Sequence, residues 1–185
     1  GRIAADGEIL VRGPSVMLGY WNNESATRET LVDGWLHTGD VGSLDPDGYL
    51  HISDRKKEMI VNSAGENIPP QKIELRLMAQ ALIDQAVVFG DRMPYLMALI
   101  FPNQELLKER VGTHADGAAT RKAIQAAIST ALADLPSHEQ VRRFALLPEA
   151  LSEANGELTP TLKVKRRVVA EHYAELLAQM GHGKG

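Results

Sequence analysis

Three short polar segments carry side chains that could bind a sugar or a phosphate. Asp40 ends a Thr-Gly-Asp sequence beside a strand-like stretch, where its carboxylate can accept two hydrogen bonds from a vicinal diol such as a ribose. Arg55 precedes two lysines, so a forked guanidinium stands beside two ammonium groups, a set suited to phosphate or ribose oxygens. The third segment, residues 163–167, reads Lys-Val-Lys-Arg-Arg. Each has a simpler interpretation, which is a self-satisfied turn for Asp40 and solvent-exposed charge for the two basic segments.

Residue types and spacing exclude several other kinds of catalytic site. The chain has no cysteine, which excludes disulfide scaffolds, thiol nucleophiles and zinc sites that use cysteine. None of the six histidines is paired at His-x-x-x-His spacing, and the sequence has neither a nucleophile elbow nor a Gly-x-x-x-x-Gly-Lys phosphate loop. Gly65 lies in a Ser-Ala-Gly-Glu-Asn segment where the backbone could approach a ligand closely, although a plain hairpin turn needs a glycine equally.

The composition is that of a globular protein, with 44% of the 185 residues hydrophobic and 24% charged. This length allows one domain, or one domain with a piece of another. The formal charge of −4 provides no global basic field that would recruit nucleic acid or an anionic membrane. No apolar run is long enough to cross a membrane. The cysteine-free composition suits a reducing compartment, so we predict a cytoplasmic protein.

Residues 1–54 show turn signals and strand-like segments with little helical periodicity, so we expect β structure there. An Asp-Pro-Asp-Gly turn at 45–48 joins two strand-like segments, because Pro presets φ and Gly accepts a positive φ. Asn22 or Asn23 could cap a short helix that ends near Thr30. The charge run at 54–58 is the best candidate for a domain boundary.

The residues after 57 predict a small α+β unit with a mixed sheet and flanking helices. The turn at 62–65 indicates a hairpin, and Pro69 and Pro70 begin a helix that carries Ile73, Leu77 and Ala81 on one face. Continuous apolar runs predict buried strands, and apolar residues at helical spacing predict further helices. The strands are expected at 86–89, 96–101 and 144–147, a Ser-x-x-Gln capping box at 137–140, and the helices at 103–111, 118–135 and 166–180.

Four sequence blocks, taken in their order and spacing, closely resemble the adenylate-forming superfamily of acyl-CoA synthetases, luciferases and peptide-synthetase adenylation domains. The resemblance covers nearly the whole chain except its Gly-rich tail. Many members place Ser-Gly before the final lysine, whereas this chain has Thr161-Leu162, which is similar to the long-chain fatty acyl-CoA synthetase branch. The blocks are Gly7-Glu8-Ile9 through Val16–Asn22, then Gly34–Asp40, then Gly48-Tyr49-Leu50 through Asp54–Lys57 to Gly65–Ile68, and finally Leu158–Lys163.

The resemblance implies two domains and an ATP-dependent reaction. Residues 1–56 would be the β-rich end of a large N-terminal adenylation domain, and residues 57–185 would be a mobile C-terminal lid. The substrates would be a long-chain fatty acid, ATP and CoA, joined through an acyl-AMP. The family's phosphate-binding loop, adenine pocket and Mg²⁺ ligands would precede Gly1. We therefore expect a fragment that holds no metal ligand and is inactive by itself.

The resemblance also assigns roles to five residues. Lys163 would be catalytic, because one ammonium group could contact both the fatty carboxylate and the α-phosphate. Asp40 and Arg55 would bind the nucleotide without reacting. Lys57 would be the hinge on which the lid rotates, and Gly65 would lie in a loop that reaches the CoA channel.

Two other functions stay open as alternatives. A non-catalytic acyl or nucleotide binding module would hold its ligand without turnover. A nucleic-acid binder that uses residues 163–167 would need a steeply salt-dependent affinity, and the acidic overall charge disfavours it. We expect no nucleic-acid partner and at most a peripheral contact with a membrane. The sequence predicts no particular oligomeric state.

Overall fold

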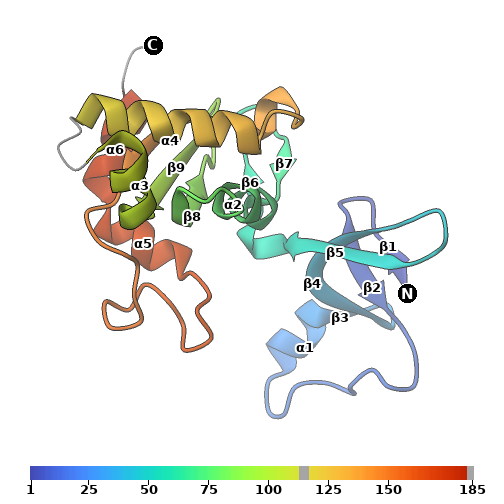
Figure 1. The fold of residues 1–185 in the computed structure, drawn as a ribbon. Coiled ribbons are helices and arrows are strands. Elements are labelled where there is room, and N and C mark those ends of the chain that lie inside the picture. Colours follow the sequence, from blue (N-terminus) through green and yellow to red (C-terminus); the bar gives the residue numbers. More distant parts are fainter. Residues whose placement is uncertain (113–116, 183–185) are drawn as a thin grey trace. The chain divides into compact units, whose positions relative to one another are not determined.

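The computed structural model describes residues 1–112 and 117–182 (Figure 1). The chain divides into two compact units, Gly1–Met59 and Ile60–Gly185. Helices and strands are mixed in the second unit, and the α+β class expected from the sequence is confirmed. Among the described residues, no helix combines the length and the hydropathy that a membrane-spanning segment requires.

The first unit is built on a five-stranded antiparallel sheet in which β4 (Trp35–Leu44) pairs with three other strands. The β4–β5 hairpin closes through the predicted turn, where Asp45 accepts the backbone amides of Asp47 and Tyr49. Ile9 and Leu10 are the buried apolar side chains of this unit. The other strands are β1 (Arg2–Ile3), β2 (Glu8–Val11), β3 (Leu31–Val32) and β5 (Leu50–Arg55).

Two short helical segments complete the first unit. Helix α1 (Glu24–Thr30) begins after Asn23, whose side-chain oxygen accepts the amide of Ala26 at 3.0 Å, so the predicted asparagine cap is confirmed. A 3-10 turn, Lys56–Glu58, follows β5 directly.

The second unit contains a three-stranded sheet in the order β10-β9-β8. Strand β9 (Leu96–Pro102) is antiparallel to β8 (Ile83–Phe89) and parallel to β10 (Val141–Leu146). Successive side chains of a strand point to opposite faces, and here both faces are apolar. The sheet therefore separates two buried clusters, one that includes Leu96, Ala98 and Ile100 and another that includes Met97 and Leu99.

Helices cover both faces of this sheet (Figure 1). One cluster is completed by α2 (Pro70–Met78), α3 (Gln104–Val111) and α4 (Gly117–Ala131). The other is completed by α5 (Arg166–His172) and α6 (Ala174–His182). A small hairpin of β6 (Ile60–Val61) and β7 (Asn67–Ile68) precedes α2, as the turn at 62–65 predicts.

Two predicted helices end earlier than expected. Helix α2 ends at Met78, so Ala81 lies beyond it and is exposed. Helix α4 ends at Ala131, and the side chain of Gln140 donates to the carbonyls of Leu132 and Leu135 just beyond this end.

Two further local predictions are wrong. Residues 137–140 do not form a capping box, because Ser137–Glu139 is a single 3-10 turn with no side-chain cap and Gln140 is engaged elsewhere. The helix expected over 166–180 is divided into α5 and α6 at Tyr173, whose φ of −108° and ψ of 26° depart from helical values.

Candidate functional site

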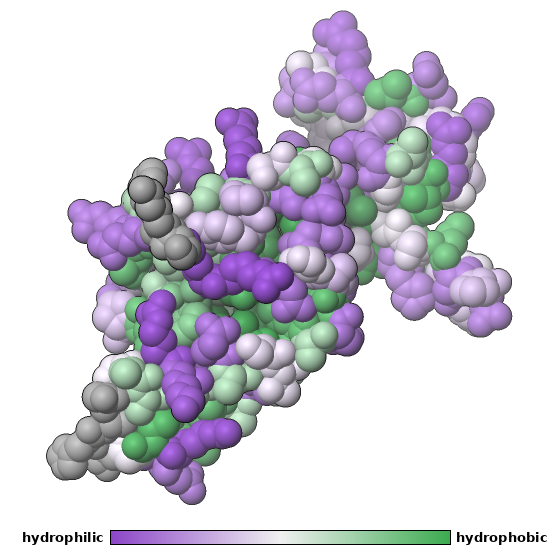
Figure 2. All heavy atoms as spheres, turned by 90° about the horizontal axis from the view of Figure 1, so that it is seen from above, coloured by the Kyte–Doolittle hydropathy of each residue, from purple (hydrophilic) through white to green (hydrophobic). Residues whose placement is uncertain are grey.

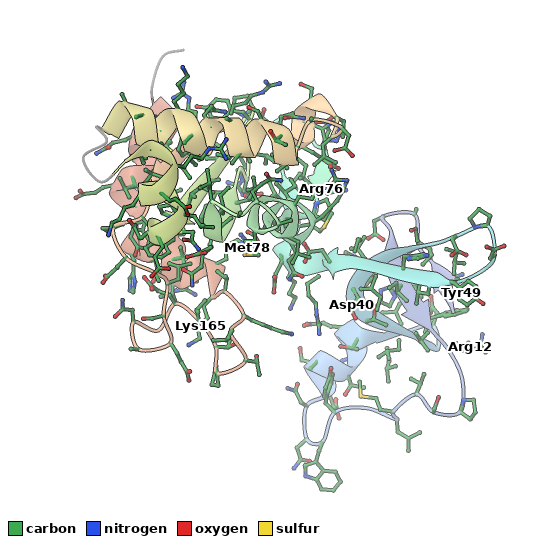
Figure 3. The ribbon with its side chains drawn as sticks, viewed as in Figure 1. Arg12, Asp40, Tyr49, Arg76, Met78 and Lys165 are labelled. Carbon is green, nitrogen blue, oxygen red and sulfur yellow. The ribbon has the colours of Figure 1, made fainter. Side chains whose placement is uncertain are left out.

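Asp40 and Arg55 form an ion pair in the first unit. They lie directly opposite each other on β4 and β5, and Arg55 Nε is 2.9 Å from Asp40 Oδ1. The Arg55 side chain is 62% exposed and the Asp40 side chain 28% exposed, so both can reach a ligand in solvent. Figure 3 marks the position of Asp40. The ion pair uses Nε, which leaves the two terminal guanidinium nitrogens able to donate to a phosphate or ribose oxygen.

A bulge in β4 presents Asp40. The register between β2 and β4 shifts between Glu8 and Leu10, and Gly39 adopts a φ of +72° inside the bulge. Only glycine takes up such a backbone conformation without steric cost. Thr38 fixes the bulge, because its hydroxyl donates to the carbonyl of Ile9 at 2.8 Å and accepts the amide of Asp40 at 3.1 Å.

Lys57 lies in the 3-10 turn after β5, at the end of the first unit. Its side chain is exposed, and it makes no ion pair with any residue in the described part of the chain. The amide of Met59 donates to the carbonyl of Arg55 at 3.1 Å and closes the turn around it.

Gly65 occupies an exposed turn in the second unit. Its φ is +80°, and its amide donates to the carbonyl of Asn62. The Asn62 side-chain oxygen accepts the amides of Ala64 and Glu66 at 3.0 and 2.9 Å, so the loop is held from within. A Cβ at Gly65 would meet nothing within 4 Å, and the glycine is therefore needed for its backbone conformation.

Lys163 leaves the tip of a tight hairpin in the second unit. An isolated antiparallel bridge joins Leu158 to Val164, and the amide and carbonyl of Lys163 are bonded to the Thr159 hydroxyl and the Thr159 amide at 3.0 and 2.8 Å. Its side chain is exposed, and no acid within the described residues pairs with its ammonium group. The backbone is thus fixed while the amine is available to a ligand. Lys165, two residues further on, is also exposed (Figure 3).

A buried carboxylate anchors the base of this hairpin. The side chain of Glu157 is 2% exposed, with Oε2 accepting the amide of Ser152 at 3.1 Å and Oε1 lying 3.1 Å from Nδ1 of His172. Burial raises the pKa of the Tyr173 hydroxyl, and the negative charge of Glu157 raises it further. The hairpin is therefore connected to both α5 and the junction with α6.

A part-buried ion pair holds the start of α5. Arg166 donates to both carboxylate oxygens of Glu74, at 2.6 and 3.2 Å, and to the carbonyl of Val88 at 2.8 Å. Glu74 also accepts the amide of Val88, so α2, β8 and α5 meet at one carboxylate. This bidentate contact fixes the chain three residues after Lys163.

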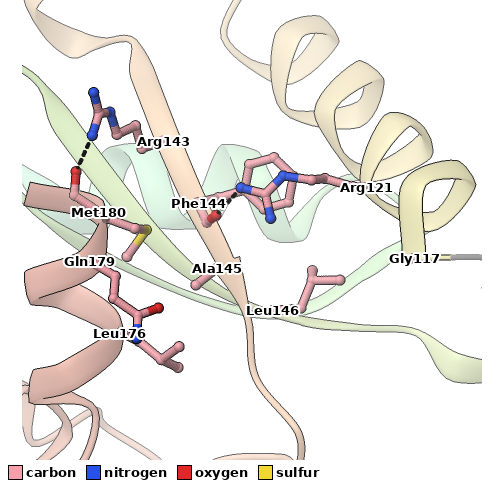
Figure 4. A pocket seen from close by; sticks show the side chains of 9 residues that line it. All are labelled: Gly117, Arg121, Arg143, Phe144, Ala145, Leu146, Leu176, Gln179 and Met180. Atoms are coloured by element: carbon pink, nitrogen blue, oxygen red, sulfur yellow. Dashed lines mark hydrogen bonds between the residues drawn. The ribbon is translucent and has the colours of Figure 1, made fainter. Parts of the chain in front are cut away.

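A hollow of about 500 Å³ lies in the second unit beside the edge strand β10 (Figure 4). Arg121 of α4 donates to the outward carbonyl of Phe144 at 3.0 Å and lies over its ring, which covers part of the strand edge. None of the five predicted site residues lines this hollow. Its lining residues are Gly117, Arg121, Arg143, Phe144, Ala145, Leu146, Leu176, Gln179 and Met180.

No group of three or more acidic or histidine side chains within residues 1–112 and 117–182 could hold a metal ion. The predicted residues fall into two sets. Asp40, Arg55 and Lys57 belong to the first unit, and Gly65 and Lys163 belong to the second.

A charged cluster of Asp6, Glu8 and Lys56, which the sequence does not predict, lies next to the predicted residues. Lys56 Nζ lies 2.7 Å from Asp6 and 2.9 Å from Glu8, which is buried. The available signal was Glu8, an acidic residue at the start of an apolar strand, together with the lysine pair at 56–57. The sequence does not show that these two segments lie side by side.

A family model described as "AMP-binding enzyme C-terminal domain" matches residues 57–182. The long-chain-fatty-acid–CoA ligase FadD15 of Mycobacterium tuberculosis is 47% identical over 184 residues, which cover 94% of this chain and 31% of the relative. Human long-chain-fatty-acid–CoA ligase 6 is 36% identical over 189 residues, which cover 95% of this chain and 27% of the relative. The chain thus spans between a quarter and a third of the length of these curated relatives.

Solved structures agree with these relatives. The adenylation domain of a carboxylate reductase from Mycobacterium chelonae superimposes with a TM-score of 0.80 at 27% identity, over 93% of this chain and 27% of that one. The A-PCP didomain of a carboxylic acid reductase from Segniliparus rugosus, in complex with AMP, gives a TM-score of 0.79 at 27% identity, over 93% of this chain and 24% of that one. Because the family model matches well over half of the chain, the chain belongs to the AMP-binding enzymes of the adenylate-forming superfamily and matches their C-terminal domain.

Proposed function

We propose that this chain is the C-terminal part of an ATP-dependent long-chain fatty acid–CoA ligase. Residues 1–56 would be the end of its large adenylation domain, and residues 57–185 its mobile lid. The small core of the first unit supports this division, as do its exposed apolar side chains, among them Leu18 and Trp21. Figure 2 shows apolar side chains, drawn in green, at the surface among polar ones.

The reaction would take place in two steps. A carboxylate oxygen of the fatty acid attacks the α-phosphorus of ATP, and the bond to pyrophosphate breaks to give acyl-AMP. The CoA thiol then loses its proton and its sulfur attacks the acyl carbonyl, which displaces AMP. Mg²⁺ would neutralise phosphate charge from ligands outside this chain. The cysteine-free composition supports a reducing compartment such as the cytoplasm.

The exposed amine of Lys163 is the observation that carries this proposal. Two anions repel each other when a carboxylate approaches a polyphosphate, and one ammonium group that contacts both relieves this repulsion as charge develops. Lysine suits the role as a compact charge on a long side chain. The fixed hairpin backbone presents this amine without an internal partner among the described residues.

The other predicted residues would serve binding and motion. Asp40 would accept the ribose hydroxyls, and Arg55 would bind nearby ribose or phosphate oxygens. Lys57, two residues before the end of the first unit, would be the hinge that carries the lid between the two steps. The same rotation would withdraw Lys163 and bring the loop around Gly65 to the CoA channel.

The test is Lys163→Ala in the full-length ligase. We expect acyl-AMP formation, measured as pyrophosphate release with a long-chain fatty acid, to fall by roughly 10²–10³-fold. Thioester formation from supplied acyl-AMP and CoA should persist, because that step does not need the amine.

Lys165→Ala is the matched control, since Lys165 is an exposed lysine on the same hairpin, and it should change either step by less than about threefold. Equal loss of both steps in Lys163→Ala would contradict the role given to Lys163. A wild-type protein that binds ATP without releasing pyrophosphate would instead support the non-catalytic binding module.

A further inference from the structure

Glu8 is a buried carboxylate whose two oxygens serve two different segments. Its side chain is 5% exposed. Oε1 accepts the amide of Gly39 at 3.0 Å, immediately before Asp40. Oε2 lies 2.9 Å from Nδ1 of His37 and accepts a hydrogen bond from Nζ of Lys56 at 2.9 Å. The ribose-binding bulge and the segment before the hinge therefore share one anion.

Lys56 is held from two sides, in contrast to the lysine beside it. Its ammonium group also lies 2.7 Å from Asp6 Oδ2, so two carboxylates bind one cation. Lys57 is exposed and has no such pairing in the described part of the chain. The side chain of Lys56 is therefore fixed to the sheet by two ion pairs, whereas the side chain of Lys57 is not.

The charges in this cluster support one another. Hydrogen bonding to Asp6 and then to Glu8 raises the pKa of Lys56, and the bond from Lys56 lowers the pKa of Asp6. Burial alone would raise the pKa of Glu8, but the bonds from Lys56, His37 and Gly39 outweigh it and lower that pKa. All three groups are therefore held in their charged forms at neutral pH.

We propose that Asp6 and Glu8 are positioning residues that clamp Lys56, so that the chain is fixed through residue 56 and lid rotation begins at Lys57. This inference rests on the proposed function. A rotation produces a defined end position only if the residue at its start is held, because a small displacement at a pivot grows with distance from it. The clamp also connects the pivot to the loop that presents Asp40.

The two half-reactions should depend on the clamp to different extents. In the adenylating orientation, Lys163 gains contacts with the substrate anions, and these contacts help to hold the lid. In the thioester-forming orientation Lys163 is withdrawn, so the orientation depends more on the pivot. Loss of the clamp should therefore affect thioester formation more than adenylation.

The kinetic test is Lys56→Met in the full-length ligase, which removes the charge and keeps a long apolar side chain. We expect thioester formation from supplied acyl-AMP to fall about tenfold, since misplacement of about an ångström can cost up to 10²-fold. Adenylation should fall by less than about threefold. Lys56→Arg should restore most of the loss, and Lys122→Met, at an exposed lysine of α4, is the matched control.

A merely structural loss would lower both half-reactions by the same factor, because it reduces only the fraction of folded enzyme. Equal loss in Lys56→Met, or unchanged rates in both steps, would overturn the clamp. An inactive wild-type ligase would overturn the proposed function without bearing on the contacts of Lys56.

Hydrogen exchange on this chain tests the clamp independently of any activity. Glu8→Gln should speed exchange at the amide of Gly39, and Lys56→Met should speed exchange at the amide of Met59, which closes the turn on Arg55. Lys122→Met should change neither. Unchanged exchange at both amides would overturn the clamp even if the ligase reaction is established.

Discussion

The pKa shifts of Asp6, Glu8 and Lys56, here called the Lys56 cluster, determine how the cluster's contribution to stability depends on pH. For Asp6 and Glu8 the pKa is lowered by folding, so their contribution to stability is complete above the ordinary values of 3.8 and 4.5 and is lost as pH falls through the lower folded values. For Lys56 the pKa is raised, so its contribution is complete below 10.5 and is lost as pH rises through the folded value. The cluster should thus be intact from about pH 5 to about pH 10.

NMR titration of the side-chain carboxyl carbons checks these directions. We expect Asp6 to titrate below 3.8 and Glu8 below 4.5 in the wild-type chain. In Lys56→Met both midpoints should move upward, because the largest favourable partner of each carboxylate is gone. Lys122→Met should leave both where they are. Midpoints that do not respond to Lys56→Met would contradict the ion pairs seen in the structure.

Individual residues differ in how far the sequence predicts them. Lys163 and Asp40 stand inside blocks whose order carries the family resemblance, so a role could be assigned to each before any coordinates. The partners of Glu8 could not be predicted, because Lys56 is 48 positions away and the bond exists only once β2, β4 and β5 have paired. Local pattern contains no information about which distant charge a buried carboxylate will meet.

At the scale of the element, the Lys163 hairpin contains a strained position. Leu162 has a φ of +59°, and its side chain is 72% exposed. A residue with a Cβ pays roughly 1–2 kcal/mol in this region, and an exposed leucine recovers little of that by packing. A glycine would adopt this φ without steric cost, so the turn is built here at a conformational cost.

Substitutions at Leu162 test this view of the turn. Leu162→Gly should leave stability unchanged or raise it by up to about 1 kcal/mol, since relief of strain exceeds the extra entropy of the unfolded chain. Leu162→Val should lower stability by about 1 kcal/mol, because a branched Cβ fits a positive φ poorly. Urea denaturation measures both. A destabilising Leu162→Gly would show that the leucine side chain contributes contacts that outweigh the strain.

Secondary structure was predictable where it depends only on residues that are close together in the sequence. The Asp45 turn, the Asn23 cap and the apolar strands β8 and β9 follow from local chemistry. The end of α4 did not, because the Gln140 side chain, which donates to the carbonyls of Leu132 and Leu135 there, comes from a residue beyond the helix. The break between α5 and α6 at Tyr173 could not be predicted, because no Pro or Gly marks it. The Tyr173 hydroxyl lies near the buried Glu157.

At the scale of the whole molecule, the two units differ in how much apolar surface they bury. The first has Ile9 and Leu10 as its buried apolar side chains, whereas the second has a cluster on each face of its sheet. Hydrogen exchange should therefore show β2 and β4 opening at lower free energy than β8 and β9. Equal protection of both sheets, lost together in one transition, would contradict this expectation.

The double-faced packing of the β8–β10 sheet bears on how the proposed ligase would be regulated. Because α2 to α6 already cover both faces of the sheet, rotation of the proposed lid would expose none of its buried apolar side chains to water. The free-energy difference between the two orientations would then depend on a few contacts at the lid surface. Such contacts are individually worth about 0–1 kcal/mol, enough to shift the occupancy of an orientation up to about fivefold. A substitution or modification of a surface side chain, far from any reacting atom, would then change the relative rates of the two half-reactions.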